Sequence, residues 1–195
     1  MKSLAGGIDA IETVVYDENG TLIVGNRIIL ASDETVRLGG GDATPYAAGD
    51  AIALTTGTSA TLALRSLTVA RVAGGSGYLT KFRLMTDQAA CVAQIRIHFF
   101  TVAQPTGPIV GDNVPMTLLY VNAGERIGAI TMPPLATSTV AGNSTGAVSQ
   151  DIADTVFGFK CAATDTKIYY RLETLTAFTP ASGQKFFLEC LCDVN

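Results

Sequence analysis

The chain has 195 residues, of which 48% are hydrophobic and only 15% are charged, well below the roughly 25% of an average soluble protein. Its 13 basic and 17 acidic side chains give a formal net charge of −4, which argues against a protein that binds nucleic acid through phosphate contacts. No uninterrupted apolar run of about 18 residues is present, so the sequence predicts a soluble protein without a membrane span or secretory signal.

Residues 1–41 are predicted to form an arm with its own β-hairpin. Residues 13–16 and 21–24 alternate like strands, and Asn19-Gly20 between them suits the positive φ angles of a type I′ turn. Strand-like pieces follow at residues 27–30 and 35–38, and Gly39-Gly40-Gly41 reads as a linker.

An isolated hairpin of this size is marginally stable in water, so the arm is expected to dock on another surface. The predicted partner-binding residues are the apolar residues of the arm: Val14, Val15, Tyr16, Leu22, Ile23, Val24, Ile28, Ile29 and Leu30.

Residues 42–195 are predicted to form the main domain, because period-2 alternation recurs along them and no helical period does. Regular alternation predicts strands at residues 78–86, 91–102, 167–176 and 185–194, and weaker patterns predict strands at residues 50–54, 62–72, 127–132 and 155–160. About eight strands in one domain predict an all-β, two-sheet antiparallel β-sandwich. The longer connections favour a jelly-roll-like strand order over a simple meander.

The four cysteines, Cys91, Cys161, Cys190 and Cys192, allow two disulfides or a metal site. Cys190 and Cys192 share one face of a strand, but neither a second closely spaced pair nor a nearby histidine completes a zinc pattern. Small core residues in a reducing compartment are the favoured interpretation, and no metal or cofactor is predicted.

The sequence favours a non-enzymatic protein. His98 is the only histidine, so a hydrolase with a Ser-His-Asp or Cys-His mechanism would have to use it. It shares the polar face of its strand with Gln94 and Arg96, which predicts an ordinary surface histidine. No nucleophile elbow or Walker A motif is present, and the aspartates sit mostly in turns, where they cap their own backbone.

Residues 127–150 contain no Asp, Glu, Lys or Arg over 24 positions. Residues 135–150 within them have neither core periodicity nor solvating charge, and two interpretations stay open: a flexible loop, or a loop laid against another subunit. The second agrees with the general shortage of charge, because interface cores are depleted of charged residues. A homo-oligomer is therefore expected.

From about residue 44 onward the chain resembles the small jelly-roll decoration, or head auxiliary, proteins of tailed bacteriophages. The resemblance lies in the order of several short stretches: Thr44-Pro-Tyr-Ala-Ala-Gly-Asp50, Gly74-Gly-Ser-Gly-Tyr-Leu79, Gln94-Ile-Arg-Ile-His-Phe-Phe100, Pro105-Thr106, Asp112-Asn113 and the closing strand at residues 185–194. The long N-terminal arm and the four cysteines depart from the family pattern.

The resemblance implies a structural virion protein without an active site, made in the bacterial host cytoplasm and bound to the capsid exterior. Its partners would be the major capsid protein and sister subunits, with a trimer favoured. The alternative is a receptor- or carbohydrate-binding jelly roll of a phage fibre or tail. Because tryptophan is absent, the sugar platforms of that alternative would be Tyr46, Tyr78, Tyr120, Tyr169 and Tyr170.

Overall fold

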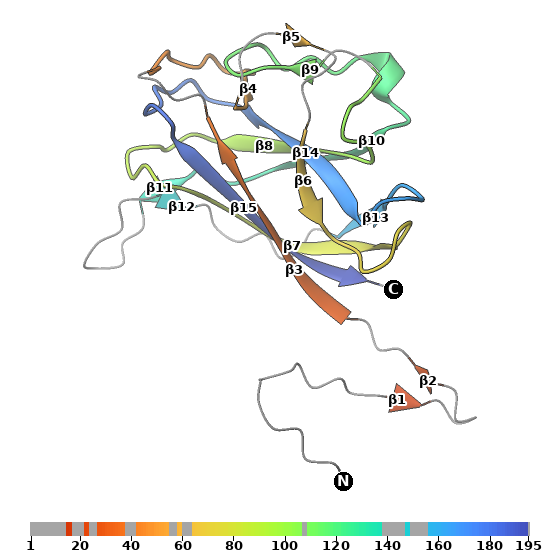
Figure 1. Cartoon of the computed structure of the whole chain (residues 1–195). Coiled ribbons are helices and arrows are strands. Elements are labelled where there is room, and N and C mark those ends of the chain that lie inside the picture. Colours follow the sequence, from red (N-terminus) through yellow and green to blue (C-terminus); the bar gives the residue numbers. More distant parts are fainter. Residues whose placement is uncertain are drawn as a thin grey trace.

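The computed structural model describes residues 15–16, 22–23, 27–37, 42–54, 58–59, 64–106, 109–137, 147–148 and 156–194. Two antiparallel sheets of five and six strands pack face to face in it (Figure 1). Among these residues the single helical element is the 3-10 turn η1 (Tyr120–Asn122). The predicted all-β sandwich is confirmed.

The first sheet contains, in spatial order, β10 (Arg126–Thr131), β8 (Ile95–Phe100), β14 (Lys167–Thr174) and β4 (Ala51–Ile52), with β6 (Arg65–Thr68) beside another part of β14. The second contains β11 (Ala136–Thr137), β12 (Ala147–Val148), β7 (Ser76–Thr86), β15 (Lys185–Val194) and β3 (Arg27–Val36), with β13 (Phe157–Lys160) also beside β7. Two further antiparallel pairs are β1 (Val15–Tyr16) with β2 (Leu22–Ile23), and β5 (Thr58–Ser59) with β9 (Ile109–Val110).

The strand order is that of a jelly roll. The chain runs from β3 in the second sheet to β4 and β6 in the first, returns to β7, and crosses again to β8. Strand β10 stays beside β8, after which the chain alternates once more through β12 and β13, β14 and β15. Each sheet thus combines strands that are distant in sequence, as in a double Greek key.

The core lies between the two sheets, and period-2 alternation explains its composition. In β15, Phe186, Leu188 and Cys190 are buried, while in β14 the buried side chains between the sheets include Tyr170 and Leu172. Aromatic rings such as Phe82 and Phe99, with centroids 5.8 Å apart, bridge the sheets. The strands predicted from alternation are therefore the ones that hold the fold together.

The predicted boundary at residue 41 differs from the structure, because β3 is an integral strand of the sandwich. Each of its ten residues pairs with β15, from Arg27 with Val194 to Val36 with Lys185. The sequence predicts two separate strand-like pieces here, at residues 27–30 and 35–38, and the polar residues Ser32-Asp33-Glu34 lie between them. Asp33 is accommodated in the strand because its carboxylate accepts hydrogen bonds from Arg65 of β6, at 2.9 Å from Nε, and from the Tyr170 hydroxyl at 3.1 Å.

The hairpin predicted at residues 13–24 is confirmed as a pairing of β1 with β2, in which Val15 lies opposite Ile23 and Tyr16 opposite Leu22. Its turn at Asn19-Gly20 and the linker at Gly39–Gly41 lie outside the described residues. Within the charge-free stretch at residues 135–150, residues 136–137 and 147–148 form short strands, which neither interpretation of the stretch expected. β11 and β12 pair with each other there, and β12 also pairs with β7.

All four cysteines are free and buried, so their predicted place in the core is confirmed. The Sγ atoms of Cys190 and Cys192 lie 3.8 Å apart on the inner face of β15. Burial raises the pKa of Cys161 to about 11, which keeps that thiol protonated near neutral pH.

Candidate interaction surface

The predicted partner-binding residues at the start of β3 divide between the two faces of the second sheet. Ile28 and Leu30 point away from the core and are 62% and 61% exposed. Ile29, between them, is partly buried and packs against the core. The structure therefore leaves Ile28 and Leu30, but not Ile29, as an apolar pair on the surface.

The remaining predicted partner-binding residues belong to the hairpin. Val15, Tyr16, Leu22 and Ile23 have a described backbone in β1 and β2, and their side chains lie outside the description, as do Val14 and Val24 entirely.

Strand β3 forms an edge of the six-stranded sheet. β15 pairs with it on one side, and no strand in the described part of the chain pairs with it on the other. The ion pair from Asp33 to Arg65 and the hydrogen bond between the Thr35 and Tyr170 hydroxyls join this edge strand to the opposite sheet. Ile28 and Leu30 thus belong to a strand that is paired along its whole length. This favours binding, because little backbone conformational entropy remains to be lost there.

A second apolar surface, which the sequence analysis missed, lies at the turn of residues 118–121. Tyr120 is 95% exposed and Val121 is 54% exposed, with Leu118 and Leu119 at 37% and 36%. A signal was present in the sequence, because residues 113–124 contain no charged side chain and include this run of four apolar residues. It has no periodicity, however, and periodicity is what identified the strands.

Hydrogen bonds fix the backbone of this turn. The Asn122 side chain is buried and accepts from the Leu119 amide at 3.3 Å, and it donates to Glu125. The Glu125 carboxylate also accepts from the Thr106 hydroxyl and amide at 2.6 and 2.8 Å, and these hydrogen bonds lower the pKa of Glu125. The apolar side chains of the turn therefore project from a rigid support.

Beside the turn lies a small open pocket, with about 20 Å³ of space for a water-sized molecule. We call it the turn pocket, and its lining residues are Leu64, Phe100, Pro105, Val110, Met116, Thr117, Leu118 and Asn122. No charged side chain lines it. The turn itself supplies one wall, since Leu118 and Asn122 belong to it.

Part of the outer face of the first sheet is covered by loop residues. Phe100 and Tyr169, paired across β8 and β14, point away from the core and pack with Leu64 and Met116 of the long connections. The prediction that His98 is a surface residue is wrong, because it lies on this covered face and is only 2% exposed. Alternation identifies the two faces of a strand but does not reveal whether a loop covers the polar one.

The buried His98 side chain forms a hydrogen bond with a carboxylate. Its Nε2 lies 2.8 Å from Oε2 of Glu173, which also pairs with Arg96 at 3.4 Å. Because a carboxylate only accepts, Nε2 carries the proton, and Nδ1 has no hydrogen-bond partner among the described residues. Burial lowers the pKa of His98, so the neutral ring is favoured. No nucleophile is bonded to the free ring nitrogen.

A buried ion pair ties the end of β3 to the loop before η1. Nη2 of Arg37 lies 3.3 Å from Oδ2 of Asp112, and both side chains are fully buried. Asp112 also accepts from the Ala53 amide at 2.8 Å and from the Tyr46 hydroxyl, and Arg37 donates to Tyr46 at 3.0 Å. Burial raises the pKa of Asp112, against the opposing effect of these hydrogen bonds. Asp112 thus does more than cap a turn, which is all that the sequence predicted for it.

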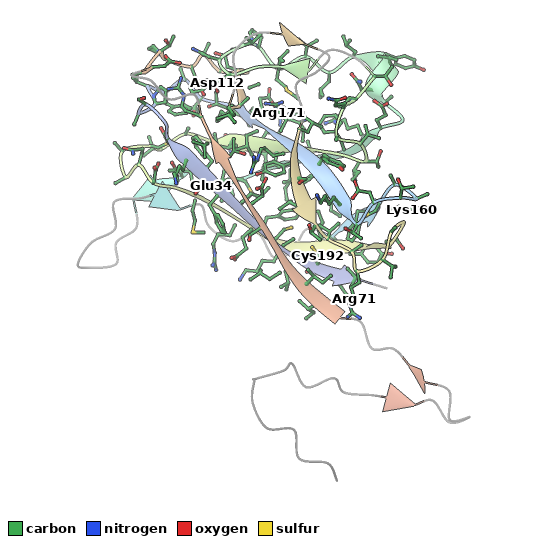
Figure 2. All side chains as sticks on the ribbon, in the orientation of Figure 1. Glu34, Arg71, Asp112, Lys160, Arg171 and Cys192 are labelled. Atoms are coloured by element: carbon green, nitrogen blue, oxygen red, sulfur yellow. The ribbon has the colours of Figure 1, made fainter. Side chains whose placement is uncertain are left out.

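Arg171 lies directly opposite His98 on the covered face and is 5% exposed. Figure 2 labels it in the same half of the sandwich as Asp112. Its Nε has no hydrogen-bond partner among the described residues. Burial lowers the pKa of Arg171 to about 10, partly offset by the nearby charge of Asp112. Alternation along β14 turns Arg171 to the face opposite Tyr170 and Leu172, and its side chain is nevertheless buried.

These polar groups are buried within the sandwich and beneath its loops. Within the described ranges, no group of three or more His, Cys, Asp or Glu side chains is arranged to hold a metal ion. No helix in the described part of the chain is long and apolar enough to cross a membrane. No family model and no curated protein matches the chain. Among the described residues, the apolar pair on β3 and the turn at residues 118–121 are two places where exposed apolar side chains lie close together in the chain.

Proposed function

We propose that the chain is a non-enzymatic structural protein of a phage virion, which decorates or cements the capsid exterior through contacts with the major capsid protein and with sister subunits. The observation that carries this proposal is the apolar pair Ile28 and Leu30, exposed on the edge strand β3 directly after the arm of residues 1–26. Exposed strand edges accept a further strand from a partner, and apolar side chains beside the edge add specificity.

The jelly-roll sandwich supports the proposal as a rigid body on which such contacts are displayed. It has a continuous core and buried ion pairs, while its surface carries few charges for its size. A surface poor in charge is best tolerated where neighbouring chains cover it. A homo-oligomer, with a trimer expected, fits this description.

The alternative role, as a receptor- or carbohydrate-binding module, receives less support. Two of the five tyrosines considered as sugar platforms, Tyr46 and Tyr170, are 1% and 0% exposed. Tyr169 is half-buried and packs against Phe100 and Leu64. Tyr78 and Tyr120 are exposed, but Tyr78 lies in β7 and Tyr120 in η1, so they belong to different elements of the fold.

Co-sedimentation of the full chain with capsids tests the proposal. The capsids are purified from a mutant of the encoding phage that lacks this protein. The wild-type chain is expected to sediment with them, and the double variant Ile28→Ser with Leu30→Ser is expected to lose most of this binding. Val92→Ser is the matched control, because Val92 is 64% exposed at a site outside the named strands. Absence of binding by the wild type, or equal binding by the double variant, would overturn the proposal.

A further inference from the structure

Arg171 is a buried arginine whose charge is not met by an ion pair. It lies on the outer face of β14 and is only 5% exposed. No hydrogen bond or ion pair joins its guanidinium to another residue in the described part of the chain, and its Nε is one of the buried atoms without a partner. Burial lowers the pKa of Arg171 only to about 10, so the side chain is still charged at neutral pH. A buried charge is costly unless an opposite charge accompanies it.

A second buried polar atom without a partner belongs to the residue directly opposite Arg171. That residue is His98 of β8, and directly opposed residues have their Cβ atoms about 5 Å apart on the same face of a sheet. His98 is 2% exposed, its Nε2 is bonded to Glu173, and its Nδ1 has no hydrogen-bond partner among the described residues. Buried polar atoms without partners are rare in native proteins, and a bound water or ion is a usual reason for them.

The charges around these two residues favour an ion over a water molecule. The nearby carboxylates already have partners, because Glu173 binds His98 and Arg96, and Asp112 lies 3.3 Å from Arg37. Four arginines and three carboxylates are named by their effects on one another and on His98: Arg37, Arg96, Arg126 and Arg171, with Asp42, Asp112 and Glu173. One positive charge is therefore in excess. A water molecule satisfies hydrogen-bonding atoms but does not balance this charge, whereas an anion does.

We propose that Arg171 binds a small inorganic anion on the outer face of the first sheet, beside His98. A guanidinium is suited to this role, because its N–H groups form a planar fork of donors that stays charged when buried. The chain as a whole has a net charge of −4, so a general attraction of anions to its surface does not explain binding at this place. The site uses neither Ile28 nor Leu30, and it is therefore independent of the proposed contact with the capsid.

His98 reports directly on the site, because it is the only histidine in the chain. A negative charge beside the ring favours its protonated form, in which Nδ1 becomes a donor. Binding of the anion is therefore expected to raise the pKa of His98 from the value set by burial, by Arg126 and Arg96, which lower it, and by Glu173, which raises it. By linkage, the anion is expected to bind more tightly as the pH falls and His98 takes up its proton.

The test follows the imidazole signals of His98 by NMR at about pH 6.5, the ordinary pKa of histidine, while sodium phosphate or sodium chloride is titrated into the full chain. The sodium salt of a bulky sulfonate buffer keeps the ionic strength constant. The wild type is expected to show a saturable shift of the signals with at least one of the two anions, and the pKa of His98 is expected to rise as the site fills.

Two variants of Arg171 assign the shift to this site. Arg171→Gln is expected to abolish it, and Arg171→Lys, which keeps the charge but loses the fork of donors, is expected to weaken binding several-fold. Arg83→Gln is the matched control, because Arg83 pairs with Glu189 at 3.4 Å in the other sheet, and it is expected to titrate like the wild type. A wild type without a saturable shift for either anion, or a folded Arg171 variant with undiminished affinity, would overturn the inference.

Discussion

Arg37 and Asp112 form an ion pair in which neither side chain is accessible to solvent, with Nη2 and Oδ2 separated by 3.3 Å. Arg37 immediately follows β3, and Asp112 lies in the long connection between β8 and β10. The pair therefore links the edge of the second sheet to a loop that crosses the first. Asp42, beside it, binds Arg37 at 3.1 Å and is partly exposed.

Replacing Asp112 by Asn is expected to reduce the free energy of unfolding by about 3 to 5 kcal/mol, because it leaves the buried Arg37 guanidinium without its buried counter-charge. Urea denaturation followed by tyrosine fluorescence measures this loss. Glu34→Gln is the control: it breaks the exposed Lys185–Glu34 pair, at 3.2 Å, and is expected to cost less than about 1 kcal/mol. Similar losses for the two variants would show that the buried pair has no special role.

The stability of the fold is expected to decrease as the pH falls below about 6.5, the ordinary pKa of histidine, because of His98. Burial lowers the pKa of His98 in the folded chain, with Arg126 and Arg96 acting in the same direction and Glu173 opposing them. The unfolded chain therefore binds a proton at a higher pH than the folded chain does. The contribution of His98 to the free energy of unfolding is therefore fully present above pH 6.5, and it is lost progressively as the pH falls towards the pKa of His98 in the folded chain.

The measurement is the free energy of unfolding at pH values between 7.5 and 5, compared with that of His98→Gln. The difference between the two proteins is expected to change by at most about 1.4 kcal/mol per pH unit, the limit for a single titrating group. Comparison with the variant cancels the contribution of Asp112, whose raised pKa acts in the opposite direction. Parallel pH profiles would show that His98 does not titrate differently in the folded state.

Two glycine-to-alanine substitutions are expected to have opposite outcomes. At Gly77 in β7, an added Cβ would lie 2.2 Å from the backbone oxygen of Asp193 in β15, so Gly77→Ala is expected to destabilise the fold by about 1 to 3 kcal/mol. At Gly124, nothing lies within 4 Å of the added atom, so Gly124→Ala is expected to be neutral or to stabilise by up to about 1 kcal/mol. Thermal unfolding of both variants checks the pair; a neutral Gly77→Ala would mean that β7 and β15 separate easily at this end.

Alternation in the sequence was sufficient to locate the strands of the core. Residues 185–194 alternate along their full length and form β15 with the same bounds, and the patterns at residues 78–86 and 167–176 fall on β7 and β14. Period 2 is imposed by the backbone of a strand, so it is visible wherever one face is buried. The number of strands and the length of their connections then favoured a jelly roll.

The candidate surfaces were predictable only in part. The exposure of Ile28 and Leu30 follows from the alternation of β3, once that strand is recognised as part of the sheet. The sequence pattern did not predict β3 as one continuous strand. Asp33 fits within it because its carboxylate accepts hydrogen bonds from Arg65 and Tyr170, which are distant in sequence. The turn around Tyr120 has no period, and its rigidity depends on Glu125 and Thr106, which only the folded chain brings together.

The sequence by itself determined the fold class, the positions of most core strands and the placement of the cysteines in the core, because these depend on local periodicity and on composition. Only the tertiary structure decided which polar groups are buried. His98, Asp112 and Arg171 have ordinary sequence surroundings, yet all three are buried, and loop residues such as Leu64 and Met116 pack on the outer face of the first sheet. Whether a strand's polar face meets water or a loop is set by the path of distant segments, and a local pattern contains no information about that path.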